Sequence, residues 1–173
     1  MNNQIKNFSN MGLDHPLKKI IYKNLNYFFF SLWLIGFTDG EGSFIVDINK
    51  NTTMKTGYQV QLSFIRTQHE RDLNLLHNIK NFFDGYGEIK TNRGKNGGNV
   101  YQYRLRNFDQ LNRYIIPLFE NFELKTQKKL DFMDFKKVAE LIIKKEHLTD
   151  EGVLKIKKIK EGMNRGRKIK IVI

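Results

Sequence analysis

Alternation of apolar and polar positions predicts four β-strands in the middle of the chain. In the first of them, Phe44, Val46 and Ile48 fall on one side and mainly polar residues on the other, which is the period of two of a half-buried strand. Polar side chains line one face of each run, so we expect an antiparallel sheet with one face exposed. The runs are Ser43–Lys50, a stretch from Tyr58 that includes Phe64, then Gly87–Asn92 and Asn99–Arg106, with a hairpin loop at 93–98.

Helical spacing of apolar residues predicts the segments that cover this sheet. The strongly apolar stretch from Leu25 to Thr38 predicts a buried helix, which we expect to end where Gly40 and Gly42 break it. Thr67 is followed three residues later by Glu70, the form of a capping box, so another helix is expected to begin there. Its stripe would consist of Leu73, Leu76, Ile79, Lys80 and Phe83.

The C-terminal part predicts three further helices. Asn107 is placed to cap a short helix that Pro117 ends. A long helix is expected from Thr126 to Lys145, and a terminal helix from Thr149. The order αββαββα plus a terminal helix defines an α+β domain. The expected core contacts of the last two helices are Leu130, Met133, Phe135, Val138, Leu141, Ile142, Leu154, Ile156 and Ile159.

Composition and charge restrict the classes of protein that remain. The 173 residues carry a net charge of +12, which favours a polyanionic partner. The lack of cysteine excludes a disulfide scaffold, a Cys-ligated zinc site, an iron–sulfur cluster and thiol catalysis. The longest apolar run, Tyr27–Phe37, is shorter than the ~20 residues of a membrane span. His69 and His77 could share a helix face, but no third ligand accompanies them.

The two ends of the chain differ in composition from its middle. Residues 1–24 are polar, show no signal-peptide pattern and are interpreted as an extension with a short helix near Leu17–Lys23. Residues 168–173 form a basic tail. Throughout the chain, Asn, Lys, Ile and Phe are abundant, and Lys greatly outnumbers Arg. These residues have AT-rich codons, which is typical of organelle genomes.

An acidic junction follows the first predicted helix. Gly36 and Gly40 lie four residues apart and therefore on one helix face, where a second helix can approach closely. Asp39 and Glu41 place two carboxylates at the helix C-terminus, the end of the macrodipole that repels anions. A bound divalent cation such as Mg²⁺ would explain acids in this position. A helix C-cap followed by a turn is the simpler alternative.

The same junction resembles the signature of the LAGLIDADG homing endonucleases. It reads LIGFTDGEGSF over residues 34–44, in which Leu34, Gly36 and Asp39 match the signature and Glu41 takes its second acidic place. The resemblance covers residues 25–167, and the stretches 147–152 and 163–166 look like the ending of many organellar members. It implies an endonuclease domain at 25–167 with the αββαββα fold, in which helices cover one face of a curved four-stranded antiparallel sheet.

The resemblance also implies roles for individual residues. Glu41 would bind metal at the scissile phosphates, helped by the Gly40 carbonyl, whereas Asp39 would be structural, near the crossing of two motif helices. Gln68 would lie at the start of the helix after the second strand and orient the attacking water. Lys125 would offset charge that develops on the phosphate. The alternatives for these last two are an ordinary first-turn residue and a solvated lysine.

The polar face of the predicted sheet is a candidate DNA-binding surface. Gln and Asn match adenine edges in the major groove, and Arg and Lys match guanine. A solvent-exposed face would more typically carry Lys and Glu. The basic residues of the loops would contact phosphates, namely Lys50, Lys55, Arg93 and Lys95. The candidate DNA-binding residues are Ser43, Asp47, Asn49, Gln59, Gln61, Ser63, Lys90, Asn92, Arg93, Gln102 and Arg104.

With one motif, the chain supplies half of a two-helix active site. The resemblance therefore implies a homodimer that cuts both strands of a long, near-palindromic DNA site with Mg²⁺, or Mn²⁺ in its place, and leaves 3′ overhangs. Two other functions stay open: an intron RNA maturase bound to its host intron RNA, and a DNA-binding protein that has lost cleavage. The chain could also be half of a fused two-motif protein. An organelle, mitochondrion or chloroplast, is the expected location, and the cytoplasm is the alternative.

Overall fold

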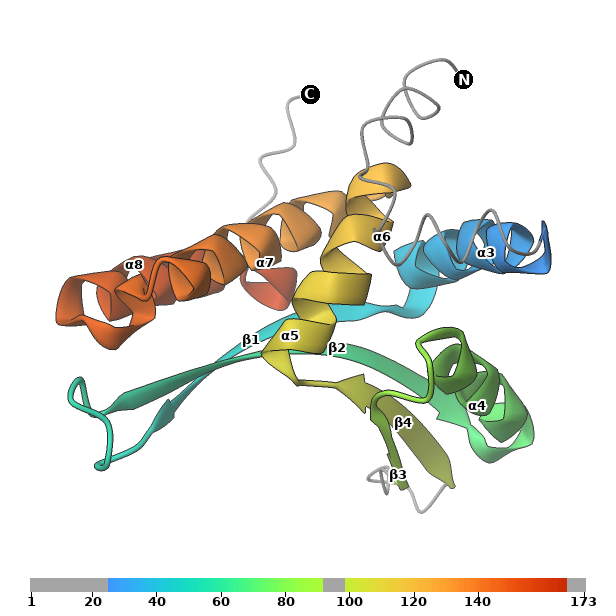
Figure 1. Cartoon of the computed structure of the whole chain (residues 1–173), viewed down its shortest axis with the longest axis horizontal. Coiled ribbons are helices and arrows are strands. Elements are labelled where there is room, and N and C mark those ends of the chain that lie inside the picture. The colour runs from blue at the N-terminus through green and yellow to red at the C-terminus, as the bar shows by residue number, and fades with distance from the viewer. Residues whose placement is uncertain (1–24, 92–98, 168–173) are drawn as a thin grey trace.

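The computed structural model describes residues 25–91 and 99–167 (Figure 1). Its sheet is antiparallel, and the helices lie over one of its faces. The predicted α+β fold and its αββαββα order are confirmed. The strands are β1 (Ser43–Lys50), β2 (Tyr58–His69), β3 (Glu88–Thr91) and β4 (Val100–Leu105), in the spatial order β1-β2-β4-β3.

Three long helices and several shorter segments complete the fold. The predicted extension at 1–24 with its helix near Leu17–Lys23, the loop at 93–98 and the tail at 168–173 lie outside the described residues. No helix at 25–91 or 99–167 is long and apolar enough to cross a bilayer. The α-helices are α3 (Leu25–Glu41), α4 (Leu73–Phe82), α5 (Phe108–Gln110), α6 (Ile116–Asn121), α7 (Lys128–Ile143) and α8 (Asp150–Glu161). The shorter helical turns are η1 (Glu70–Asp72), the π-helical η2 (Leu111–Ile115), η3 (Glu146–Leu148) and η4 (Asn164–Gly166).

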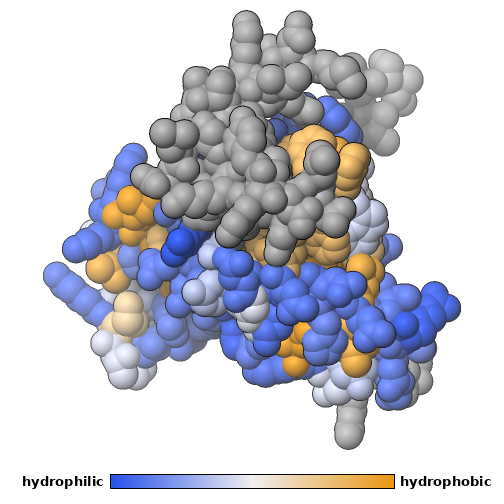
Figure 2. Space-filling model, turned by 45° about the vertical axis from the view of Figure 1, so that its right-hand side comes forward, coloured by the Kyte–Doolittle hydropathy of each residue, from blue (hydrophilic) through white to orange (hydrophobic). Residues whose placement is uncertain are grey.

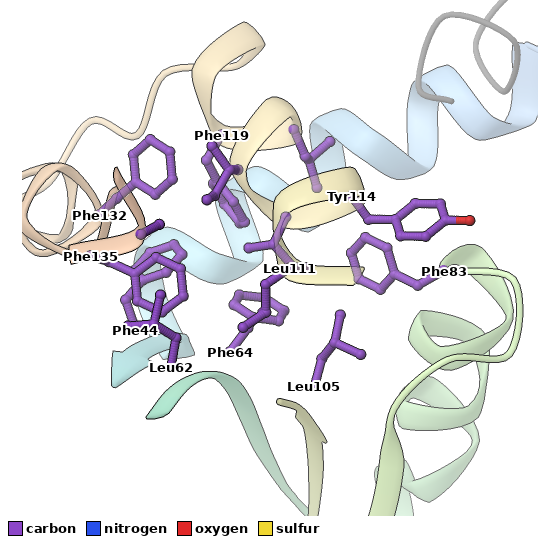
Figure 3. Packing of buried hydrophobic residues seen from close by; sticks show 14 of the residues in the cluster. Phe44, Leu62, Phe64, Phe83, Leu105, Leu111, Tyr114, Phe119, Phe132 and Phe135 are labelled. Carbon is purple, nitrogen blue, oxygen red and sulfur yellow. The ribbon is translucent and has the colours of Figure 1, made fainter. Parts of the chain in front are cut away.

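A cluster of aromatic rings joins the sheet to the helices above it (Figure 3). The ring of Phe44 on β1 lies 5.0 Å from that of Phe119 on α6, and 5.3 Å and 5.4 Å from those of Phe132 and Phe135 on α7. Each such pair contributes roughly 0.5–1.5 kcal/mol beyond the burial of its area. Because this core occupies one face of the sheet, the polar alternate positions of the strands face the other way.

The predicted capping box at Thr67 is wrong. Strand β2 continues through Thr67 and Gln68, which pair with Gln102 and Tyr101 of β4. Pairing with β4 therefore overrides the local capping signal. The N-cap is His69 instead, whose Nδ1 accepts a hydrogen bond of 3.3 Å from the Arg71 backbone N–H. As a result, Gln68 lies near the end of a strand and not in the first turn of a helix.

Helix α3 ends between the two predicted glycines, whereas Pro117 does not end a helix. Helix α3 continues through Gly40 to Glu41 and ends directly before Gly42, whose N–H still donates to the Thr38 carbonyl at 2.9 Å. Pro117 lies in the first turn of α6, where a missing N–H is tolerated. The wider π turn at 111–115 precedes it and carries the helical path past the proline. The predicted cap at Asn107 is confirmed, since its Oδ1 accepts from the Gln110 N–H.

The buried face of α7 is partly shifted from the prediction. Leu130 and Met133 are 38% and 44% exposed, whereas the neighbouring Asp131 is buried together with Phe132. A carboxylate can face inward here because Asp131 accepts hydrogen bonds of 2.9 Å from the Asn164 N–H and from Arg167. On α8 the predicted contact Leu154 is 63% exposed, while Val153 and Ile156 are buried. The predicted cap Thr149 is confirmed, since it accepts from the Gly152 N–H at 3.1 Å.

Candidate active site and nucleic-acid surface

The C-terminal turn of α3 presents one uncommitted carboxylate. Glu41 is the last residue of the helix and is exposed. Its carboxylate makes no hydrogen bond or ion pair with any residue in the described ranges. The next residue, Gly42, is buried and leads directly into β1. Glu41 is therefore held at a junction between helix and sheet, and neither of its carboxylate oxygens is engaged by residues 25–91 or 99–167.

Asp39, two residues earlier, is committed to a structural contact. Its carboxylate accepts hydrogen bonds from the Lys125 N–H at 2.7 Å, the Thr126 N–H at 3.1 Å and the Thr126 hydroxyl at 2.6 Å. Burial raises the pKa of Asp39, but the hydrogen bonds from Thr126 and Lys125 outweigh it, so the pKa is lowered overall. These bonds tie α3 to the segment before α7 and favour a structural role. The predicted position near a helix crossing stays a prediction.

Replacing Asp39 with Ala is expected to lower the free energy of unfolding by about 1 kcal/mol at pH 7, as the loss of a capping carboxylate does. Because its folded pKa is below the unfolded value of about 3.9, the contribution is present above that value and is lost as the pH falls through the folded pKa. Urea unfolding at pH 7 and at about pH 2 measures both limits. Asp109→Ala, on an exposed acid without such contacts, is the control. An equal loss at both pH values would contradict the assignment.

Two cations approach the carbonyl end of α3. The Lys128 ammonium donates to the Gly42 carbonyl and lies 3.5 Å from the Gly40 carbonyl. Burial and the charge of Arg66 lower the pKa of Lys128, against the opposing effect of nearby acids that include Glu41. The Arg66 guanidinium donates to the Phe37 carbonyl at 2.9 Å. Cations in this position offset the negative end of the helix macrodipole, where the acids also lie.

The residues around Glu41 fit a metal site that a single chain leaves incomplete. No group of three or more acidic or histidine side chains gathers anywhere in residues 25–91 and 99–167. One chain offers the Glu41 carboxylate and, beside it, the Gly40 carbonyl. Mg²⁺ needs oxygen ligands but commonly takes only one or two protein carboxylates, with water and substrate phosphates at its other positions. This donor set therefore suits a cation that is shared with phosphates and a second carboxylate.

The open face of the sheet carries an ordered polar network at β3 and β4. Arg104 donates to the Gln102 side-chain oxygen at 2.8 Å, and Gln102 donates to the Thr67 hydroxyl at 3.2 Å. On β3, Lys90 and Glu88 form an ion pair of 2.7 Å. A hollow of about 240 Å³ lies among these side chains. Such fixed donors and acceptors can be read by a partner with matching polar edges.

The predicted DNA-binding residues differ in how accessible they are. Figure 2 shows a largely hydrophilic face of the molecule with separate apolar patches. Ser63 is fully buried, at a position where its small side chain faces Ile45 across the strand pair, so the single chain does not offer it to a partner. Exposed are Asn49, Gln59 and Lys90; partly buried are Ser43, Asp47, Gln61, Gln102 and Arg104; Asn92 and Arg93 lie outside the described residues.

Comparison with known proteins decides the family. The family model of the LAGLIDADG endonucleases matches residues 34–139, more than half of the chain. The chain belongs to this family. The match begins at Leu34, in the helix that carries Asp39 and Glu41, and ends at Ala139 in α7, so it includes the whole sheet. The resemblance of the acidic junction to the LAGLIDADG signature is therefore confirmed.

The chain spans only about a quarter to two fifths of the length of the curated relatives that it matches. A probable intron-encoded endonuclease of Neurospora crassa is 40% identical over 131 residues, which covers 76% of this chain and 24% of the relative. A mitochondrial protein of Saccharomyces cerevisiae is 28% identical, over 94% of this chain and 36% of the relative.

Solved structures share the fold at comparable identity. The homing endonuclease I-TnaI superposes with a TM-score of 0.73 at 40% identity, over 79% of this chain and 88% of its own. The LAGLIDADG homing endonuclease I-SmaMI, bound to cleaved DNA, gives 0.74 at 41% identity, over 79% of this chain and 44% of its own. It has also been solved with an uncleaved DNA target in the presence of calcium ions.

The structure also places the residues to which the family resemblance gave roles. Gln68 is half-buried near the end of β2. Lys125 lies beside the acidic tip through its backbone, but its ammonium pairs with Glu123 at 3.0 Å. Sequence reasoning missed Arg66 and Lys128. The alternation of β2 gave a signal for Arg66, because a charged residue stands there at a core position, whereas nothing distinguished Lys128 from the lysines around it.

Proposed function

We propose that the chain is a metal-dependent, site-specific DNA endonuclease. The free Glu41 carboxylate, held at the end of the family's motif helix beside two cations, is the observation that carries this proposal. When bound, a divalent cation polarises the phosphate, lowers the pKa of water and stabilises the departing oxygen. Glu41 would hold that cation together with the Gly40 carbonyl. Structures of one relative, I-SmaMI, contain DNA, and one of them was solved in the presence of calcium ions, which supports a divalent ion, Mg²⁺ or Mn²⁺, here.

The second half of the site would come from another copy of this chain. Phe29, Leu32 and Trp33 on α3 are 62%, 42% and 40% exposed. Gly36 lies seven residues after Phe29 and three after Trp33, and Gly40 lies four after Gly36, so both glycines continue the same stripe of the helix. A Cβ on either glycine would meet nothing within 4 Å. Ser31, Leu34 and Thr38 face the core from the opposite side of α3. The stripe is therefore an apolar surface with room for a close helix–helix contact, and pairing would bring two Glu41 carboxylates together.

DNA would lie across the open face of the sheet. Arg104 is held by Gln102, so its remaining donors are fixed in direction, which suits a guanine edge. Asn49, Gln59 and Gln61 line the long β1–β2 ribbon, while Lys50 and Lys55 lie at its end and would contact phosphates. The positive charge of the chain predicts a steep salt dependence, with a slope of about −0.9 per phosphate neutralised. A homodimer would bind a long, near-palindromic duplex.

Two further roles in the reaction remain to be assigned to residues of the site. Gln68 would orient the attacking water by a hydrogen bond. A lysine would offset the charge that develops on the phosphate. Lys125 remains a candidate for that role, and Lys128 joins it because its ammonium already lies at the acidic tip.

Replacing Lys128 with Met is expected to reduce the single-turnover cleavage rate by about 10²-fold, since one charged donor at a developing anion contributes on this scale. Lys125→Met should cost much less, because its ammonium points to Glu123. Both variants are compared under saturating Mg²⁺ and DNA, with Lys144→Met, an exposed lysine at the far end of α7, as the control. A larger loss in Lys125→Met would return the role to Lys125.

The proposed activity is tested on a target duplex selected by repeated rounds of binding from a random library. Selection in Ca²⁺ requires binding alone. The selected duplex is then incubated with Mg²⁺, and double-strand cleavage with 3′ overhangs is the expected result. Binding without cleavage would indicate a DNA-binding protein that has lost activity. Failure to select any duplex, together with binding to the host intron RNA, would instead support a maturase.

We also propose that the protein is located in a mitochondrion, because the Saccharomyces cerevisiae relative is a mitochondrial protein.

A further inference from the structure

Arg66 is a charged residue in the hydrophobic core. It follows Leu62 and Phe64 on the helix-facing side of β2, where the alternation of the strand calls for an apolar side chain. Arg66 is 0% exposed, and its side chain is among the largest that are fully buried in the described part of the chain. Burial of a charge is unfavourable unless hydrogen bonds compensate it. An arginine in this position therefore needs specific acceptors.

Those acceptors all lie in the last two turns of α3. Nη1 donates to the Phe37 carbonyl at 2.9 Å, and Nη2 donates to the Thr38 hydroxyl and, at 3.5 Å, to the Leu34 carbonyl. The guanidinium also lies over the Phe37 ring, with its carbon 4.4 Å from the centroid. Thr38 in turn donates to the Leu34 carbonyl at 2.6 Å. One planar side chain thus binds three groups of the helix end at once.

The same side chain packs against the residue that follows Glu41. A Cβ on Gly42 would lie 2.9 Å from Nη1 of Arg66 and 2.6 Å from Thr38. The chain is therefore held on both sides of Glu41, by hydrogen bonds before it and by close packing after it. Burial lowers the pKa of Arg66 to about 9, while the charge of Glu41 acts in the opposite direction. The guanidinium is protonated at neutral pH.

We propose that Arg66 is a positioning residue for cleavage, which fixes the end of α3 so that the Glu41 carboxylate is presented in one orientation to a metal ion. This inference rests on the proposed endonuclease function. A purely structural role predicts instead that any loss of cleavage follows a loss of thermal stability. Replacement of a buried ion by an apolar side chain of similar volume is often neutral or stabilising, so Arg66→Met can leave the fold intact. Loss of positioning would then affect metal use and local order without a matching fall in melting temperature.

The test compares Arg66→Met, which keeps the length of the side chain, with Arg66→Lys, which keeps the charge but loses the planar fork. Arg113→Met, on an exposed arginine of η2, is the matched control. Hydrogen exchange of the amides of residues 38–43 is measured by mass spectrometry on each protein. We expect exchange at least about tenfold faster in Arg66→Met, an intermediate effect in Arg66→Lys and none in Arg113→Met. Protection of the core strands should not change.

Cleavage of the selected duplex is the second measurement. In Arg66→Met, the Mg²⁺ concentration that gives half of the maximal rate should rise about 10-fold or more, while the melting temperature and the DNA affinity in Ca²⁺ stay close to those of the wild type. Unchanged exchange at 38–43 with unchanged Mg²⁺ dependence would overturn the inference. So would a loss of cleavage that parallels a fall in melting temperature. Failure of the proposed function is distinguishable, because the wild-type protein itself would then not cut.

Discussion

Replacing Glu41 with Gln is expected to abolish cleavage, with a fall in the single-turnover rate of about 10³-fold or more. The amide keeps the size of the side chain, but it removes the negative charge and one of the two oxygens that could bind a metal ion. Because Glu41 makes no hydrogen bond or ion pair with the described residues, this change breaks no short contact and removes only the attraction of its charge for Arg66 and Lys128. The effect should therefore be confined to chemistry, and the melting temperature should remain near that of the wild type.

Binding and cleavage are measured separately for this variant. Affinity for the selected duplex in Ca²⁺ should not fall by more than a few fold, and Mg²⁺ should produce neither nicked nor linear product. Glu161→Gln, an exposed glutamate at the end of α8, serves as the matched control and should cut normally. Wild-type cleavage rates in Glu41→Gln would remove the carboxylate at position 41 from the site and with it the proposed mechanism.

Local pattern predicted the strands well because each face of this sheet has one kind of environment. The strand Ser43–Lys50 was predicted with the bounds that the structure gives, since Phe44 and Val46 point to a dry core and their neighbours do not. The end of β2 could not be predicted, because it depends on pairing with β4, some 35 residues away. Likewise, the inward position of Asp131 depends on Arg167, 36 residues later in the chain.

The candidate site, too, could be predicted from the sequence only in part. Asp39 and Glu41 lie two residues apart in the sequence, so a motif was enough to find them. Their different uses were not visible there, because the hydrogen bonds that engage Asp39 come from residues 86 and 87 positions away. Arg66 and Lys128 act on the same helix end from a strand and from a later helix. Only the folded chain brings these elements together, so sequence spacing carried little information about them.

The second large effect is expected on assembly. Gly36→Leu should convert the proposed dimer to a monomer, because a large side chain would be forced into a close helix–helix contact. Overpacking of this kind costs roughly 1–3 kcal/mol or more per site, which weakens association about tenfold or more. The single chain should not be harmed, since a Cβ at Gly36 meets nothing within 4 Å and leucine favours a helix by about 0.5–1 kcal/mol over glycine.

Sedimentation of the purified chain with and without the selected duplex measures this effect. The wild type should be a dimer on DNA, and Gly36→Leu should bind weakly as a monomer and cut slowly, with partial recovery at high protein concentration by mass action. Gly36→Ala should give a smaller loss. The control is Gly162→Ala at the end of α8, where an added Cβ would make only an ordinary contact of 3.5 Å with the Ile159 carbonyl. This variant should remain dimeric.

If Gly36→Leu assembles and cuts like the wild type, the exposed stripe of α3 is not the dimer contact. A wild-type chain that cuts both strands as a monomer would exclude the shared site altogether, because one Glu41 would then have to serve both cleavages.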